Sequence, residues 1–497
     1  MTARNLLTDP VWQAGDLGHP IPDSPHATSV CLPLWAHAVG YEEGDEAVLS
    51  KLGCGYPRFV FHHTVRALIQ RARERHAQNG EDCLVVPRRV VAERLCAYLQ
   101  RRGQHAARIV DDEGLAVVLF ASEAAPVAKA FWQHTGEIVS SRLAEDHLAG
   151  TVADPAEGAA AEDALRQRLA TIYGVAPADV LLFTNGMAAM AAAKRGLDAV
   201  GRHRPSVQLG FPYVDVLKMQ EQFGGGAHFV PGTGPRSLDV MRTLIARAPV
   251  SGCVIETPGN PLLSCPDIAA VSEMMHQHGG LLVIDDTIGS AGNIHVLPYA
   301  DLVMGSLTKY FGGLGDVMGG SLVINPASPH ATALHTALRD DHDGLLYARD
   351  AIVLEHHSRD YLERLRAINT NADRVAAFLA GHPAVDTVYH PSLPGNETFA
   401  KLRRPDGGNG GLLSFTLHDG ATRAPQVYDK LRVSKGPSLG TNYTLACPYT
   451  ILAHYHELDW AEEHGVSPHL IRVSVGLEDA DDLIARFTEA LASITPC

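Results

Sequence analysis

The sequence predicts an α/β fold built on a mostly parallel sheet. Residues 281–284 and 302–304 are short apolar runs bounded by glycine or acidic residues, which is typical of buried parallel strands. Comparable runs at residues 179–183, 207–210 and 253–256 alternate with helical patterns along the chain. Alternation of this kind places helices on both faces of a sheet.

The composition is that of an ordinary folded protein and excludes several classes of function. The chain has 497 residues, 46% of them hydrophobic, which is enough for about two or three domains. A net charge of −15 argues against a general nucleic-acid binder. No apolar run approaches the ~20 residues that span a bilayer, so we expect no membrane contact. The N-terminus lacks a signal-peptide pattern and the cysteines form no C-x-x-C pair, so we expect a cytoplasmic protein without a metal site.

Residues 1–130 are expected to form a separate N-terminal α/β extension. After an irregular start, the periodicity predicts helices at 61–78 and 88–100 and strands at 83–86, 107–110 and 115–120. The segment GYPRF at residues 55–59 could be a ligand loop, but we predict a structural turn there. We assign no residue of the extension to a cofactor site.

Residues 131–330 are expected to form one large α/β domain. It begins with a connector at residues 131–142 and an amphipathic helix at residues 160–173. Further on, a strand runs into Gly186 and Met187, and an alanine-rich helix follows. Backbone N–H groups at such a helix start can bind a phosphate, although small residues there also suit tight packing of a helix on a sheet.

Residues 331–497 are expected to form a smaller C-terminal α+β domain. A single long helix is predicted at residues 351–379. It is followed by strands at 384–389, 410–417 and 470–476 and by helices at 423–431 and 479–493.

Two neighbouring strand ends carry the residues with the most distinctive chemistry. Asp285 ends one strand, whereas Ser306, Thr308 and Lys309 follow the next one. Ligands of open α/β sheets bind at such strand ends. A carboxylate for a pyridinium nitrogen, hydroxyls for a phosphate and a lysine for a Schiff base are the parts of a pyridoxal 5'-phosphate (PLP) site. The alternatives are a helix-capping aspartate and a surface lysine.

From residue 131 onward the chain resembles the cystathionine γ-synthase family, the Cys/Met-metabolism group of fold-type I PLP-dependent transferases. The motifs that carry this resemblance are E-T-P-G-N-P at 256–261, I-D-D-T at 284–287, S-L-T-K-Y with G-D-V-M-G-G within 306–320, and R-V-S-V-G-L-E at 472–478. The N-terminal extension resembles that of the fungal cystathionine γ-synthases. The resemblance implies a mostly parallel seven-stranded sheet in the large domain and PLP as the cofactor.

The resemblance also implies cofactor-binding roles for individual residues. Lys309 would hold PLP as a Schiff base and move the proton at the substrate Cα. Asp285 would pair with the pyridinium N–H and keep the ring an electron sink. The other residues implied at the cofactor are Ser306 and Thr308 with the Gly186 and Met187 amides at the phosphate, Tyr213 stacked on the ring as a second catalytic residue, and Asn260 beside the ring 3-hydroxyl.

At the substrate, the resemblance implies that Arg472 holds the α-carboxylate through a bidentate pair and that Ser438 assists. A buried structural ion pair is the alternative role for Arg472.

The chain also departs from the family pattern. The family's Tyr-Ser-Arg is Ser140-Ser141-Arg142 here, so a tyrosine is missing, whereas Arg142 would still bind the phosphate of a neighbouring subunit. Asp286 stands in place of an asparagine, and Tyr443 in place of a glutamate. The implied assembly is a homotetramer, a dimer of dimers with shared active sites.

The implied reaction is γ-replacement on an O-acyl-L-homoserine, with L-cysteine as the nucleophile and L-cystathionine as the product. Its substrates are small amino acids, and the steps require an electron sink, an anchored carboxylate and a base at Cα. A sulfhydrylase, a γ-lyase or a γ-replacement with a carbon nucleophile in a specialised pathway are alternatives. A non-catalytic relative is a third possibility, which the intact Lys309 argues against.

Overall fold

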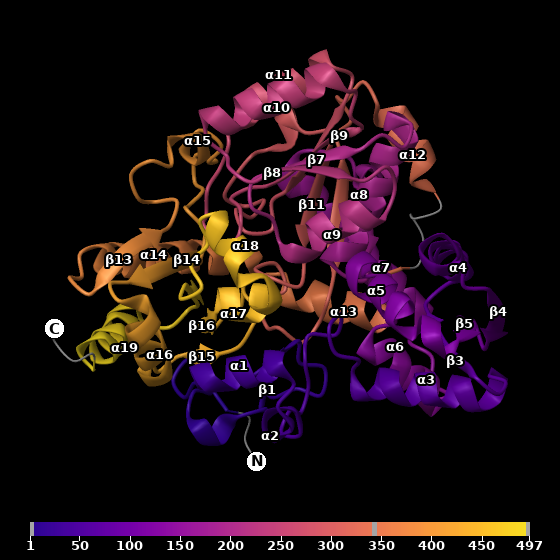
Figure 1. Cartoon of the computed structure of the whole chain (residues 1–497), viewed down its shortest axis with the longest axis horizontal. Helices are drawn as coiled ribbons and strands as arrows, with labels where there is room; N and C mark the ends of the chain where they lie inside the picture. The colour runs from indigo at the N-terminus through magenta and orange to yellow at the C-terminus, as the bar shows by residue number, and fades with distance from the viewer. Residues whose placement is uncertain (1–3, 340–344, 494–497) are drawn as a thin grey trace.

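A seven-stranded sheet is the centre of the large α/β unit in the computed structural model, which describes residues 4–339 and 345–493 (Figure 1). The strands lie in the order β6 (Val180–Phe183), β12 (Gly320–Ile324), β11 (Leu302–Ser306), β10 (Leu281–Asp285), β9 (Gly252–Glu256), β7 (Ser206–Leu209) and β8 (Ala227–Val230). All pairs from β11 to β8 are parallel, whereas β12 is antiparallel to both of its neighbours. The mostly parallel seven-stranded sheet predicted from the sequence is therefore confirmed.

Helices cover both faces of this sheet. Successive side chains of a strand point to opposite sides, so each face presents apolar side chains that the helices bury. Leu281 and Val283 of β10 belong to one apolar core, and Leu282 and Ile284 belong to the other. The helices of the large unit are α7 (Pro155–Tyr173), α8 (Gly186–Gly201), α9 (Val214–Gln222), α10 (Pro235–Arg247), α11 (Ile268–Gln277) and α12 (Ala331–Ala337). Burial on both faces explains why these strands are uninterrupted apolar runs rather than alternating ones.

The sheet topology brings six strand ends to one edge. The parallel strands β7, β8, β9, β10 and β11 all end there, and β6 also points there because two antiparallel pairings separate it from β11. The residues that follow β6, β7, β9, β10 and β11 therefore meet along this edge, which is where open α/β sheets bind their ligands.

The C-terminal unit is a five-stranded sheet covered by helices. Its strand order is β13 (Val385–Tyr389), β14 (Leu412–Leu417), β17 (Ile471–Ser474), β16 (Leu445–Pro448) and β15 (Ser434–Lys435). Its helices are α14 (Tyr361–Ala380), α15 (Glu397–Ala400), α16 (Gly420–Lys430), α17 (Tyr449–His454), α18 (Leu458–Glu463) and α19 (Ala480–Ala492). The predicted α+β character of this unit is confirmed.

The N-terminal extension has two parts. An arm with β1 (Pro20–Ile21), β2 (Ser29–Val30), α1 (Trp35–Glu43) and α2 (Glu46–Leu49) lies against the C-terminal unit near α16 and α17 (Figure 1, indigo). A three-stranded sheet follows, built from β3 (Glu81–Val86), β5 (Leu115–Ala121) and β4 (Ala107–Asp112) with α3 (His63–His76), α4 (Arg89–Gly103) and α5 (Ala125–Thr135). The chain then enters α6 (Ser141–Ala149).

Two segments differ from the sequence prediction. The expected connector at residues 131–142 begins as the end of α5, which stops where Gly136 adopts a positive φ of 65°, so the predicted domain boundary at residue 130 falls inside a helix. The single long helix is two helices, α13 (Ala348–His357) and α14. Arg168 donates to the Glu355 carbonyl and to Ser358 Oγ at this break, over 3.3 and 2.7 Å, which satisfies the end of α13.

Among residues 4–339 and 345–493, no helix combines the length and the apolar character needed to cross a bilayer.

Candidate active site

A cavity of about 380 Å³ lies at the edge where these strands end. Residues from the N-terminal extension, the large unit and the C-terminal unit all line it. The predicted site residues among them are Gly186, Met187, Tyr213, Asn260, Asp285, Ser306, Lys309, Ser438 and Arg472. Thr308 and Arg142 do not line this cavity.

Lys309 projects into this cavity from the turn after β11. Its Nζ donates to Ser438 Oγ over 3.1 Å, which ties the amine to the C-terminal unit. Burial lowers the pKa of Lys309, and the positive charges of Arg472 and Arg58 lower it further, against an opposing effect of Tyr56. A lowered pKa increases the neutral fraction of the amine, which is the nucleophilic form.

Asp285 ends β10 at the floor of the cavity. Its Oδ1 accepts from the Thr287 amide over 2.9 Å. Burial raises the pKa of Asp285. Glu256 lies beside Asp285 at the end of the neighbouring strand β9, and burial together with the Asp285 charge raises the pKa of Glu256. Two buried carboxyls without a cation are costly, so this floor suits a ligand that brings a positive N–H group.

A close approach of two elements forms the anion-binding part of the cavity. The helix α8 begins at Gly186, and Asn185 caps it by accepting from the Ala188 amide over 3.1 Å. A Cβ atom on Gly186 would lie 2.8 Å from the Ser306 Cβ, so a glycine is required there. The start of α8 and the Ser306 side chain thus fit a phosphate, and with Asp285 and Lys309 the residues present fit PLP.

Thr308 does not line the cavity, and its hydroxyl is hydrogen-bonded within its own loop. Its hydroxyl donates to the Gly319 carbonyl over 3.3 Å and accepts from the Gly319 amide over 3.1 Å. In this arrangement Thr308 closes the loop between β11 and β12, and its contact with a phosphate stays a prediction.

Arg472 on β17 forms the opposite wall of the cavity with only 5% of its surface exposed. It donates to Asn260 Oδ1 over 3.2 Å and to the Pro437 carbonyl over 2.8 Å. Its guanidinium also lies 5.0 Å from the centre of the Tyr449 ring. No carboxylate is among these partners, so a bound carboxylate would provide the counter-charge for Arg472.

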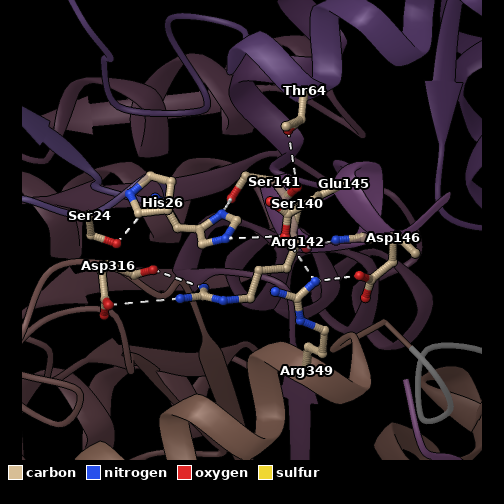
Figure 2. A network of polar contacts seen from close by, with 12 residues as sticks. Ser24, His26, Thr64, Ser140, Ser141, Arg142, Glu145, Asp146, Asp316 and Arg349 are labelled. Carbon is tan, nitrogen blue, oxygen red and sulfur yellow. Dashed lines mark hydrogen bonds and ion pairs between the residues drawn. The ribbon is translucent and has the colours of Figure 1, made fainter. Parts of the chain in front are cut away.

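The segment at residues 140–142 lies outside this cavity, in a polar network with the N-terminal arm (Figure 2). Arg142 donates to the Asp316 carbonyl over 2.9 Å and to the Asp350 carboxylate over 3.2 Å. His26 of the arm hydrogen-bonds Ser141 Oγ over 2.9 Å (Figure 2). The chain therefore does not bring Arg142 to its own cavity, and the contact of Arg142 with a neighbouring phosphate stays a prediction.

Tyr443 does not line the cavity either. Its hydroxyl donates to the Leu314 carbonyl over 3.1 Å, and its ring packs in a small apolar cluster with Val11 and Ile21 of the arm. The substitution at this position therefore serves the attachment of the arm.

Sequence reasoning missed a group of residues from the N-terminal extension. Tyr41, Glu42, Tyr56, Arg58 and Phe59 all line the cavity. The prediction that residues 55–59 are only a structural turn is therefore wrong. Two aromatic rings and an arginine within one short turn are unusual for a solvent-exposed loop, and that local composition was the available signal.

Comparisons with known proteins agree with this geometry. The model of the family described as Cys/Met metabolism PLP-dependent enzymes matches residues 157–492, and that of the N-terminal domain of fungal trans-sulfuration enzymes matches residues 64–140. The cystathionine gamma-synthase of Neurospora crassa is 32% identical over 96% of this chain and 98% of its own length. An L-2-amino-4-chloropent-4-enoate dechlorinase/desaturase of Streptantibioticus cattleyicolor is 36% identical over 95% of this chain and 97% of its own length.

A solved structure is similar as well. The crystal structure of cystathionine gamma synthase from Xanthomonas oryzae pv. oryzae in complex with aminoacrylate and cysteine has a TM-score of 0.59 and 30% identity. The match covers 67% of this chain and 85% of that chain.

Proposed function

Because the chain belongs to the Cys/Met metabolism family of PLP-dependent enzymes, we propose that it catalyses γ-replacement on an O-acyl-L-homoserine. The proposed nucleophile is L-cysteine, and the product is then L-cystathionine. The enzyme is cystathionine γ-synthase-like over its whole length, since relatives match both the extension and the large unit.

The observation that carries this proposal is that Lys309, Asp285 and Arg472 line one cavity. Lys309 follows β11, Asp285 ends β10 and Arg472 lies in β17, so both units of the fold contribute to the cavity. The reaction of an α-amino acid on PLP requires three groups, namely a base, a carboxylate for the pyridinium and a fixed guanidinium for the substrate carboxylate.

Each of these residues has a defined task in the proposed reaction. Bound PLP would supply the electron sink for the pair left at Cα. Arg472 would bind the substrate carboxylate and fix the orientation of Cα. Lys309, held by its hydrogen bond to Ser438, would take the proton from Cα, and the γ-acyloxy group would later leave as a carboxylate.

A γ-elimination without an added nucleophile is the second candidate. It is favoured by the 36% identity with a relative that is named a dechlorinase/desaturase. Apolar side chains of the extension and of α17, including Val30, Leu32 and Leu452, also line the cavity.

A product assay separates the two candidates. The purified PLP-loaded protein is incubated with O-acetyl- or O-succinyl-L-homoserine, with and without L-cysteine, and the products are identified by mass spectrometry. Formation of L-cystathionine that depends on cysteine supports γ-replacement. Release of a keto acid and ammonia at the same rate in both samples would support γ-elimination instead.

A further inference from the structure

The turn at residues 55–59 places an aromatic ring over the reactive amine of the cavity. Lys309 Nζ lies 4.8 Å from the centre of the Tyr56 ring. The ring belongs to the N-terminal extension, whereas the amine follows β11 of the large unit. A cation held over an aromatic face at this distance is stabilised by the ring, and most strongly where water is excluded.

Hydrogen bonds at the two residues that follow Tyr56 hold in place the turn that carries its ring. Arg58 donates to the Asp215 carboxylate over 2.5 Å, to the Gln133 carbonyl over 2.6 Å and to the Tyr213 hydroxyl over 2.5 Å. On the other side of the turn, the Trp132 indole donates to the Pro57 carbonyl over 3.2 Å.

The turn is also closed by its own backbone. The amides of Phe59 and Val60 donate to the Tyr56 carbonyl over 2.9 and 3.0 Å. The backbone that carries the Tyr56 side chain is thus fixed from within the turn as well as by the large unit.

The charges around the two groups are consistent with this contact. Burial alone would raise the pKa of Tyr56, but the positive charges of Lys309 and Arg58 outweigh it, so this pKa lies below its ordinary value. The positive charges of Arg472 and Arg58 both disfavour the protonated, positively charged form of Lys309. An electron-rich ring in contact with Lys309 can offset this repulsion when Lys309 becomes positive, in addition to the hydrogen bond with Ser438.

We propose that Tyr56 is a further catalytic residue of this site, whose ring face stabilises the positively charged nitrogen of Lys309. In the proposed reaction, the proton leaves the substrate Cα and binds Lys309 Nζ, which becomes an ammonium group. No electron or other atom is exchanged with Tyr56. The ring lowers the free energy of this charged form. A residue of the N-terminal extension thereby takes part in the proton transfer at Lys309 of the same chain.

The proposal rests on the proposed function only in one respect, namely that the proton bound by Lys309 comes from the substrate Cα. Its test does not need a substrate, because the nitrogen of Lys309 can also be titrated in the resting protein. The visible absorbance of the full-length, PLP-loaded protein changes when the Lys309 nitrogen loses its proton, and its pH dependence gives the pKa.

Tyr56→Leu removes the aromatic face, and we expect it to lower this pKa by about one unit. Tyr56→Phe keeps the face, so its pKa should stay within about 0.3 units of the unaltered protein. The matched control is Phe61→Leu, which removes an aromatic ring that follows the turn but does not line the cavity, and which should leave the pKa unchanged. An unchanged pKa in Tyr56→Leu, or an equal shift in Tyr56→Phe, would overturn the proposal.

A series of fluorinated phenylalanines at position 56 keeps the test decisive if Tyr56→Leu does not fold. Each fluorine weakens the negative face of the ring while its shape is nearly kept. A pKa that falls steadily with the number of fluorines supports the proposal, and a pKa independent of fluorination contradicts it. A pKa that falls along the series in a protein that forms no cystathionine would instead count against the proposed function alone.

Discussion

Arg58 of the N-terminal extension and Asp215 of α9 form an ion pair with 2.5 Å between Nη1 and Oδ2, and at most 2% of either side chain is exposed. Burial alone would raise the pKa of Asp215, but the charge of Arg58 and a hydrogen bond from His134 lower it to about 2. The pair fixes the turn at residues 55–59 to the wall of the cavity. The contact that attaches the extension to the large unit therefore also brings residues 55–59 into the cavity lining.

Breaking this pair from one side should be strongly destabilising. Arg58→Met leaves the Asp215 carboxylate buried without its counter-charge, and we expect a loss of about 3–5 kcal/mol in the free energy of unfolding. The double variant Arg58→Met/Asp215→Asn removes the stranded charge and should recover more than half of that loss. Denaturant midpoints of both variants measure the effect, and a double variant no more stable than the single one would contradict it.

The sequence predicted the sheet well because each of its strands is an apolar run with a clear boundary. Residues 281–284 are a run of branched apolar side chains that is buried on both faces, which is typical of a central parallel strand. The break between α13 and α14 was not predicted. The end of α13 is bonded by Arg168, which lies almost two hundred positions earlier in the chain, and local periodicity carries no signal of such a contact.

The candidate site was predictable only where its residues follow strands. Lys309, Asp285 and Ser306 lie at strand ends, and parallel topology brings such ends together. Tyr56 and Arg58 lie in a turn of the extension, and no local pattern states which surface a turn will contact. Their position follows from the long-range pairing of Arg58 with Asp215, which is a property of the folded chain.

Lys309→Ala should abolish the proposed reaction while the fold is kept. The variant removes both the covalent attachment point for PLP and the base at Cα, so we expect a loss of roughly a thousandfold or more in kcat. The yellow absorbance should also no longer be fixed to the protein by borohydride. Lys401→Ala, at an exposed position, is the matched control and should retain activity. Borohydride fixation in Lys309→Ala would mean that another lysine holds the cofactor.

Arg472→Lys should change substrate binding more than turnover. The variant keeps a positive charge but loses the planar fork that can hold a carboxylate at two points. We expect KM for the acylhomoserine to rise about tenfold to a hundredfold, with a smaller change in kcat. Steady-state kinetics with the acyl donor varied give both numbers. A fall in kcat with an unaltered KM would place Arg472 outside the carboxylate site.

Asp286→Asn should stabilise the protein in a pH-dependent manner. Burial raises the pKa of Asp286 to about 7, partly opposed by the hydrogen bond that Tyr173 donates over 2.9 Å. In the unfolded chain this pKa is about 3.9, so the folded state binds more protons between these values. The stability that the protonated carboxyl contributes is complete below about pH 4 and is lost as the pH rises through 7.

Asparagine at position 286 stays neutral at every pH, so the stability contributed by a neutral side chain there is not lost as the pH rises. The advantage of Asp286→Asn in the free energy of unfolding should therefore grow by on the order of 2 kcal/mol between pH 5 and pH 8. Melting temperatures at several pH values in this range measure the change. Asp163→Asn, where 80% of the side chain is exposed, is the matched control and should show no such trend. A difference between Asp286→Asn and the unaltered protein that is constant with pH would mean that Asp286 is already ionised in the folded state.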